Sequence, residues 1–208
     1  MERTSIIREV MIRMDEILPP GESISHPFEN YINSVVDESY RQILNECPIS
    51  LLPLKEVAGT VIYEHSTTQL AYVPVPDDFI RIGLFKFSDW TNPATRHITI
   101  ESPEYKIIET GVLAGGVVKP SVLLTHAKKG SDTTPRRYLR CYKVSTIGSK
   151  EYLYYVYYDK DTGITELSDL VITGLTWCAA AKLMQILELP GLKVAEERYQ
   201  QFLLLNSK

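Results

Sequence analysis

The sequence predicts an α+β fold in which terminal helices form a helical bundle and a mostly antiparallel β domain is inserted between them. Apolar residues recur with helical spacing at both ends of the chain. Between about residues 60 and 158 they come instead in short runs separated by Pro, Gly, Asp and Asn, which is typical of strands and turns. We assign the helical bundle to residues 1–58 and 165–208 and the inserted β domain to residues 59–164.

Two helices are predicted in the N-terminal part, at residues 4–18 and 28–46, and residues 49–57 are expected to form a short helical turn. Each helix has one apolar stripe, and polar residues occupy the opposite face of the second. The expected caps and stops are Thr4 or Ser5 and Pro19-Pro20-Gly21 for the first helix, and Ser25 or His26 with Pro27 and then Pro48 for the second.

The middle of the chain is predicted to contain about seven strands. They are expected at about 59–64, 70–74, 80–87, 96–100, 120–126, 137–146 and 151–158, with a short helix that starts near residues 102–105. The last two strands are predicted to form a hairpin across residues 147–150. Two segments, residues 110–119 and 127–136, are glycine-rich or polar and are expected to be mobile loops.

Helical spacing returns at about residues 166–188 and 191–205. Thr165 or Ser168 is expected to cap the first of these helices, and Pro190-Gly191 separates it from the second. Gly174 and the alanines at 179–181 leave little side-chain bulk on part of the first helix, which predicts that another backbone approaches it closely.

Composition narrows the class of protein. The chain has 208 residues, a formal net charge of -4, 44% hydrophobic residues and 23% charged residues, which are ordinary values for a globular domain. The three cysteines, Cys47, Cys141 and Cys178, are odd in number and far apart, which argues against a disulfide framework and for a reducing compartment. Charged residues interrupt every long apolar stretch, so neither a secretory signal nor a membrane span is expected.

The sequence shows no motif that predicts a catalytic site, a metal site or a cofactor site. The four histidines show no metal-ligand spacing. The glycines before Lys119 do not match a phosphate-binding loop, and Asp159 begins a polar turn rather than a calcium loop, because Ile164 and Leu170 occupy two positions that calcium binding requires. The alternative to a protein without such sites is a small enzyme whose site lies around Asp77, Asp78 and His97.

A local basic patch contrasts with the acidic net charge. It consists of Lys128, Lys129, Arg136, Arg137 and Arg140. One interpretation is a solvated loop and strand rim, and the other is a phosphate-binding surface. The second interpretation would make the chain a nucleic-acid-binding accessory protein.

Residues 70–90 carry a resemblance to a known family. They read Leu-Ala-Tyr-Val-Pro-Val-Pro-Asp-Asp-Phe-Ile-Arg-Ile-Gly-Leu-Phe-Lys-Phe-Ser-Asp-Trp. This segment, with the helix that ends near Leu51-Leu52-Pro53, Lys119-Pro120 and the alanine-rich helix at 175–187, resembles the head-to-tail connector proteins of tailed bacteriophages, also called adaptor or ring proteins. The ring proteins of crAss-like podoviruses are the variant that it resembles most. The similarity extends from about residue 28 to residue 205 as a loose pattern.

The resemblance implies a virion structural protein without catalytic residues, metal or cofactor. Such proteins form a ring, commonly of twelve subunits, between the portal protein and the tail or further ring proteins. The ring extends the DNA channel and provides a platform for tail attachment, so the expected location is the neck of the virion, and the host cytoplasm during assembly. No membrane contact is implied. A mildly acidic chain suits genomic DNA that passes through without specific binding, because each neutralised phosphate tightens binding.

Contacts with neighbouring subunits are expected from the two loops. In some relatives a long C-terminal tail reaches the portal, but this chain continues only about three residues beyond its last predicted helix, so loops are expected to replace that contact. The candidate interface residues are Gly111, Gly115, Gly116, Lys119, Lys128, Lys129, Arg136 and Arg137.

Overall fold

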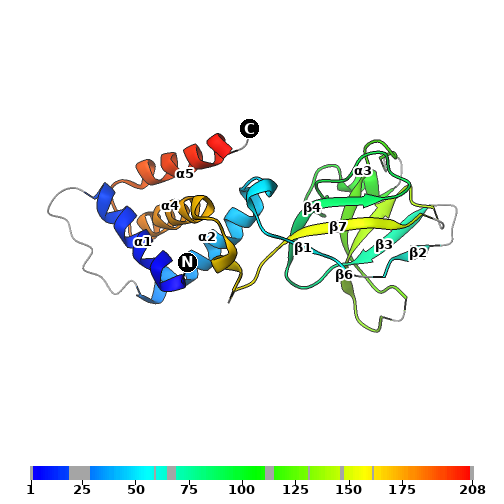
Figure 1. Ribbon diagram of the computed structural model, residues 1–208, viewed down its shortest axis with the longest axis horizontal. Coiled ribbons are helices and arrows are strands. Elements are labelled where there is room, and N and C mark those ends of the chain that lie inside the picture. Colours follow the sequence, from blue (N-terminus) through cyan, green and yellow to red (C-terminus); the bar gives the residue numbers. More distant parts are fainter. Residues whose placement is uncertain are drawn as a thin grey trace. The chain divides into compact units, whose positions relative to one another are not determined.

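The computed structural model describes residues 2–18, 29–58, 60–64, 69–110, 115–130, 132–145, 148–160 and 162–206. They form an α+β fold, as predicted (Figure 1). The chain divides into two compact units, which we call the helical unit, Met1–Pro53 with Tyr158–Lys208, and the β unit, Leu54–Tyr157. Helices from both ends of the sequence therefore share one unit, and the strands lie in the other.

The helical unit is organised around one central helix. Its elements are α1 (Arg3–Ile17), α2 (Glu29–Glu46), the 3-10 turns η1 (Ile49–Leu51) and η2 (Gly163–Glu166), α4 (Asp169–Ile186) and α5 (Leu192–Asn206). Helix α4 packs against α1, α2 and α5, and most of its side chains are buried. The predicted N-cap Ser168 is confirmed, because its hydroxyl accepts the Val171 N–H at 3.4 Å.

A small residue on α4 makes room for a side chain and not for the backbone that the sequence predicted. A Cβ placed on Gly174 would lie 2.3 Å from the Phe202 ring, so the missing side chain makes room for this aromatic residue of α5. The element that approaches is thus an aromatic ring rather than a backbone. Ala179 and Ala180, farther along α4, are fully buried.

The β unit contains two antiparallel sheets. Its elements are β1 (Leu54–Glu56), β2 (Ile62–Glu64), β3 (Leu70–Pro74), β4 (Phe79–Phe87), α3 (Tyr105–Glu109), β5 (Val122–Ala127), β6 (Arg136–Tyr142) and β7 (Lys150–Tyr157). One sheet has three strands in the order β1-β7-β4, and the other has four in the order β2-β3-β6-β5.

The four-stranded sheet buries side chains on both faces. Along β6, Leu139 and Cys141 belong to the larger core with residues of β4 and β7, whereas Tyr138 and Tyr142 belong to a second core with Tyr105 of α3. Successive side chains of a strand point to opposite faces, so each face of β6 contributes to a different core. This double burial explains why the apolar run of β3 is nearly continuous.

The predicted hairpin between the last two strands is wrong. Strand β6 lies between β3 and β5 in the four-stranded sheet, so both of its edges are occupied. Strand β7 pairs instead with β1 and β4 in the other sheet. Strands β6 and β7, which are consecutive in the sequence, thus belong to different sheets.

The strand predicted at residues 96–100 is not formed either. The chain at residues 94–98 passes from one sheet to the other and pairs with each at a single point: Ala94 bridges Phe85 of β4, and Ile98 bridges Leu123 of β5. The bridge to Leu123 is parallel. A crossing segment cannot build a ladder with either sheet.

Strand β1 was not predicted from the sequence. Its presence makes the boundaries between the two units differ from the predicted ones. Its three residues are exposed and show no alternation, and only 49–51 of the expected turn at 49–57 is helical. Because β1 pairs with β7, the boundaries lie after Pro53 and after Tyr157 rather than after residues 58 and 164.

The prediction for the start of α1 is also wrong. The helix begins at Arg3, the capping position is Glu2 rather than Thr4 or Ser5, and the Glu2 side chain makes no capping hydrogen bond. Pro19-Pro20-Gly21 and the caps proposed at Ser25, His26 and Pro27 lie outside the described residues.

Replacement of Gly174 by alanine tests the α4–α5 contact. We expect Gly174→Ala to destabilise the helical unit by about 1–3 kcal/mol, because the new methyl group overlaps the Phe202 ring. Helix propensity alone would predict a gain of about 1 kcal/mol. Hydrogen exchange of α4 amides, measured by mass spectrometry, gives the sign.

The matched control is Gln185→Ala at an exposed position of α4, which should change the exchange of α4 little. Combining Gly174→Ala with Phe202→Leu should recover part of the loss. Greater protection in Gly174→Ala would contradict the proposed contact.

Candidate functional site

The turn that joins β3 to β4 contains the segment on which the resemblance depends. Pro76 has no N–H, and aspartates tolerate turn dihedrals, so Pro76-Asp77-Asp78 forms the turn and Phe79 begins β4. The Phe79 N–H donates to the Pro76 carbonyl at 3.2 Å. This turn brings Asp77 and Asp78 beside residues of β1, β6 and β7.

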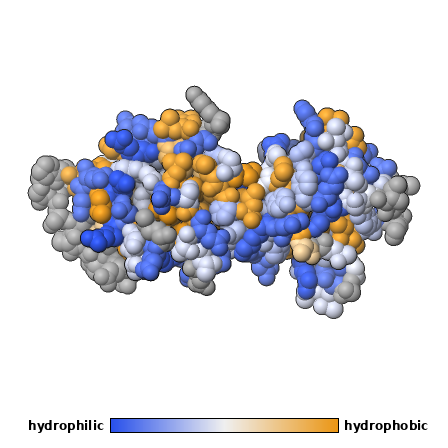
Figure 2. Space-filling view, viewed as in Figure 1, coloured by the Kyte–Doolittle hydropathy of each residue, from blue (hydrophilic) through white to orange (hydrophobic). Residues whose placement is uncertain are grey.

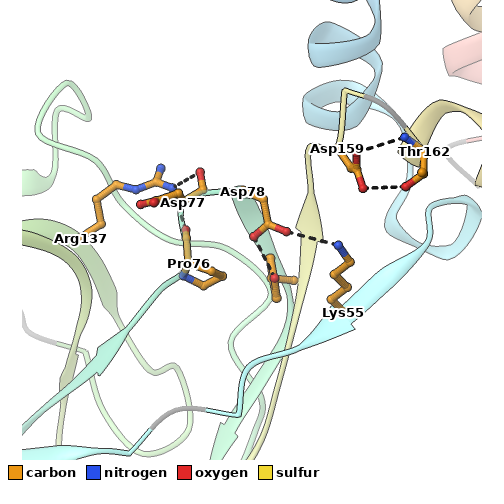
Figure 3. A network of polar contacts seen from close by, with 8 residues as sticks. Lys55, Pro76, Asp77, Asp78, Arg137, Asp159 and Thr162 are labelled. Carbon is orange, nitrogen blue, oxygen red and sulfur yellow. Dashed lines mark hydrogen bonds and ion pairs between the residues drawn. The ribbon is translucent and has the colours of Figure 1, made fainter.

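Arg137 of β6 holds this turn in place (Figure 3). Its guanidinium donates to the carbonyl oxygens of Pro76 at 2.9 Å, Asp77 at 2.8 Å and Phe79 at 3.3 Å. The same guanidinium lies 6.0 Å from the centroid of the Phe79 ring. Since three carbonyl oxygens of the chain itself accept from Arg137, this candidate interface residue has a structural role.

The two carboxylates of the turn take different environments. Asp78 accepts from the Tyr155 hydroxyl at 2.9 Å and forms an ion pair with Lys55 at 3.4 Å, so it connects the turn to β7 and β1 (Figure 3). Burial, and then the hydrogen bond to Asp78, raises the pKa of Tyr155, which keeps its hydroxyl a donor. Asp77 is exposed, and its carbonyl rather than its carboxylate receives Arg137.

His97 lies against the same turn. Its ring centroid is 5.4 Å from that of Phe79. Burial, and then the charges of Arg137 and Arg81, lower the pKa of His97 to about 4, so the ring is neutral at physiological pH. Its Nδ1 is buried without a hydrogen-bond partner among the described residues. Within that part of the chain no hydrogen bond connects His97 to either aspartate.

The other residues of the basic patch differ in their exposure and in their ion pairs with residues of the chain. Lys129 is paired with Glu64 and lies 4.0 Å from the centroid of the Tyr72 ring. The Arg136 guanidinium lies 3.7 Å from the Asp132 carboxylate, and 67% of the Arg136 side chain remains exposed. Lys128 is exposed and makes no ion pair or hydrogen bond within the described residues. The rim of the β5–β6 connection is therefore only partly available to a partner.

The glycine-rich segment is a tight turn where it is described. Gly115 has φ +71°, and a Cβ there would lie 2.6 Å from the Lys119 carbonyl oxygen. The Gly116 N–H donates to the same oxygen at 3.1 Å. The Thr91 N–H donates to Val117 at 2.7 Å, which connects the turn to the segment after β4. Gly111 lies outside the described residues.

Two surface hollows of the β unit lie beside candidate interface residues. One, of about 530 Å³, lies between residues 92–98 and the turn at 115–122, which includes Gly115 and Lys119. The other, of about 650 Å³, is lined by Val75, Pro76, Asp77, His126, Pro135, Arg136 and Arg137. Sequence reasoning found the charged and glycine residues of both hollows but missed Val75, Pro135 and the segment at 92–98. These residues come from distant segments and follow no common spacing.

The polar turn at Asp159 in the helical unit is confirmed. The Asp159 carboxylate accepts the Thr162 N–H at 3.1 Å and the Thr162 hydroxyl at 2.7 Å (Figure 3). This hydrogen-bonded loop leads into η2.

Cys47, Cys141 and Cys178 are buried, as small apolar residues are, and none of them takes part in a disulfide within the described residues. In the part of the chain that the structure describes, no group of three or more His, Cys, Asp or Glu side chains could hold a metal ion. None of the described helices is both long and apolar enough to cross a membrane.

Neither the protein-family models nor the curated proteins compared with this sequence include a match.

Arg137 is expected to be the most important charged residue for the stability of the β unit. We expect Arg137→Ala to lower the free energy of unfolding by about 2–4 kcal/mol, because several hydrogen bonds to carbonyl oxygens are lost at once. Arg137→Lys should recover only a minor part, since an ammonium does not reproduce the planar geometry of the guanidinium. Urea unfolding followed by Trp90 fluorescence in a Trp177→Phe background measures both.

The matched control is Arg136→Ala, one residue away on the same strand, which should change stability by less than about 0.5 kcal/mol because the side chain is mostly exposed. Equal losses for Arg136→Ala and Arg137→Ala would contradict the structural role of Arg137.

The low pKa of His97 predicts that acid destabilises the β unit. Between pH 6.5 and about pH 4 the unfolded chain binds a proton at His97 that the folded chain does not. Above pH 6.5 protonation of His97 does not lower the free energy of unfolding. As the pH falls below that value, the free energy of unfolding decreases by up to about 3 kcal/mol. Urea unfolding at several pH values should show this decrease.

His97→Gln should flatten the pH dependence in this range, whereas His126→Gln, at an exposed position, should leave it unchanged. An equally steep pH dependence in His97→Gln would show that other groups cause it.

Proposed function

We propose that this chain is a virion structural protein that forms a ring of copies, commonly twelve, between the portal protein and the tail of a tailed bacteriophage. In this role it extends the DNA channel and offers a platform for the tail or for further ring proteins. It occupies the neck of the virion, and it is present in the host cytoplasm during assembly.

The observation that carries the proposal is the structural role of the segment that resembles connector proteins. Trp90, which closes that segment, is buried, and its indole N–H donates to the Tyr142 carbonyl at 3.1 Å. Its ring lies against Phe85 and Phe87, with centroids 5.2 Å and 5.1 Å away. A likeness in residues that build a core supports a shared fold rather than a shared catalytic site.

The use of charge in the β unit supports the same role. Arg137, Lys129 and Asp78 are occupied by contacts within the chain. The whole chain has a net charge of -4. A protein of this kind attracts the phosphates of passing DNA weakly, as a conduit requires.

Particles of the phage that encodes the chain provide the test. Mass spectrometry of purified virions should detect the chain, in about twelve copies relative to the known copy number of the capsid protein. Electron cryo-microscopy should show density of this fold between portal and tail. Infection without a functional copy of the gene should yield filled heads that lack tails.

The control is a complementing copy supplied in trans, which should restore tailed particles. Virions that lack the chain would exclude the proposed function. A purified chain that remains monomeric would not exclude it, since assembly of a ring on its portal is compatible with a free monomer.

A further inference from the structure

The hollow of about 530 Å³ in the β unit, which we call the turn hollow, has walls that are held together within the chain. One wall is formed by residues 92–98 and the other by the turn at 115–122. The side-chain amide of Asn92 donates to the Val118 carbonyl at 3.0 Å, which joins the two walls directly. The shape of the turn hollow is therefore set before any ligand binds, and a preformed site loses less entropy on binding.

The charges that line the turn hollow are all positive. They belong to Arg96 and Lys119, and no aspartate or glutamate is among the described residues of the lining. Lys119 is exposed and makes no ion pair or hydrogen bond within the described residues. The Arg96 side chain is 81% exposed, and its ion pair with Glu104 spans 3.9 Å, a distance too long for a hydrogen bond. Both cations thus keep donors for a further partner.

Two hydroxyl groups add neutral donors to the same lining. They belong to Thr95, beside Arg96, and to Ser121, two residues after Lys119. Neither hydroxyl has a hydrogen-bond partner within the described residues. A Cβ on Gly115 would lie 2.6 Å from the Ser121 hydroxyl, so the glycine keeps this group uncovered.

This combination of donors matches the chemistry of phosphate. Guanidinium and ammonium groups form strong, charge-assisted hydrogen bonds with phosphate oxygens, and a guanidinium can bind two of these oxygens at once. Hydroxyl groups donate to the same kind of acceptor. A phosphate offers more oxygen atoms than a carboxylate, so it can accept from donors on two walls at the same time.

We propose that the turn hollow binds a phosphate group, either free or as part of a larger molecule. Arg96 and Lys119 contact its oxygens from the two walls, and the hydroxyls of Thr95 and Ser121 donate to the same group. Glu104, which lies near Arg96 but outside the lining, weakens the binding. This inference is independent of the proposed function, since such a site can exist whether or not the chain belongs to a virion.

The second hollow, of about 650 Å³, fits an anion less well. Its lining includes Asp77, and the Arg137 guanidinium in it already donates to carbonyl oxygens of the chain. An apolar ligand fits the turn hollow poorly. Figure 2 shows hydrophobic residues at the surface of the β unit, mainly at its top. Among the described residues that line the turn hollow, however, Val118 is the only large apolar one that is exposed.

Titration of the isotope-labelled full-length chain with inorganic phosphate, followed by NMR, tests the site. At constant ionic strength the backbone amide signals of Arg96, Lys119 and Ser121 should shift saturably at phosphate concentrations up to about 10 mM. Arg96→Ala and Lys119→Ala should each weaken binding about tenfold, because a charge-assisted hydrogen bond is lost. Glu104→Gln should strengthen binding about two- to fivefold, because a nearby negative charge is removed.

The matched control is Lys128→Ala, which removes another exposed lysine of the β unit outside the turn hollow and should leave the affinity unchanged. Unchanged amide signals in β6 and β7 verify that each variant remains folded. A nucleoside 5′-monophosphate and a short single-stranded oligonucleotide distinguish the sources of the phosphate. Tighter binding of the mononucleotide would support a small phosphate ester, and tighter binding of the oligonucleotide would support a nucleic-acid backbone.

Three outcomes would overturn the phosphate site. The first is the absence of saturable shifts at Arg96, Lys119 and Ser121. The second is acetate binding as strong as phosphate binding at the same ionic strength, which would show that the hollow does not select phosphate. The third is an equal affinity for phosphate in Lys119→Ala and Lys128→Ala, which would show that the shifts report general attraction to a charged surface.

Discussion

The antiparallel pairing of β1 with β7 brings together the two ends of the inserted β unit. Leu54 pairs with Val156 and Glu56 with Tyr154, so the chain enters and leaves the β unit at neighbouring positions. Gly83 contributes, since a Cβ there would lie 2.9 Å from the Leu54 side chain. Because entry and exit coincide, helices separated by about half the sequence can share one core around α4. Three exposed residues of β1 thus determine how the whole chain is divided.

A second constraint follows from the position of β6 in the centre of its sheet. A central strand has both edges occupied, and β6 also buries side chains on both faces. Arg137, near one end of this strand, donates to the backbone of the β3–β4 turn. The β3–β4 turn places the Asp78 carboxylate where it accepts a hydrogen bond from Tyr155 and forms an ion pair with Lys55. The charged residues that were candidates for a phosphate or catalytic site are, in this part of the chain, largely connections between strands.

These connections bear on the proposed role in a phage neck. A subunit that must transmit force between neighbours benefits from turns that are held by several hydrogen bonds, and it presents its remaining free charges at the surface.

Much of the helical unit was predictable from the sequence, because helical periodicity and the N-cap at Ser168 depend on residues close together in the chain. The α+β class followed from the same local patterns. The division of strands between two sheets was not predictable, since β6 and β7 are adjacent in sequence yet pair with distant partners. The candidate site was predicted in part, since Arg136, Arg137 and Lys119 do border surface hollows. Only tertiary contacts with the carbonyl oxygens of the β3–β4 turn decided that Arg137 is held within the chain while Arg136 is exposed. The spacing of apolar and capping residues reports the preference of a segment for a helix or a strand. The partner with which a strand pairs depends on contacts between residues far apart in the chain.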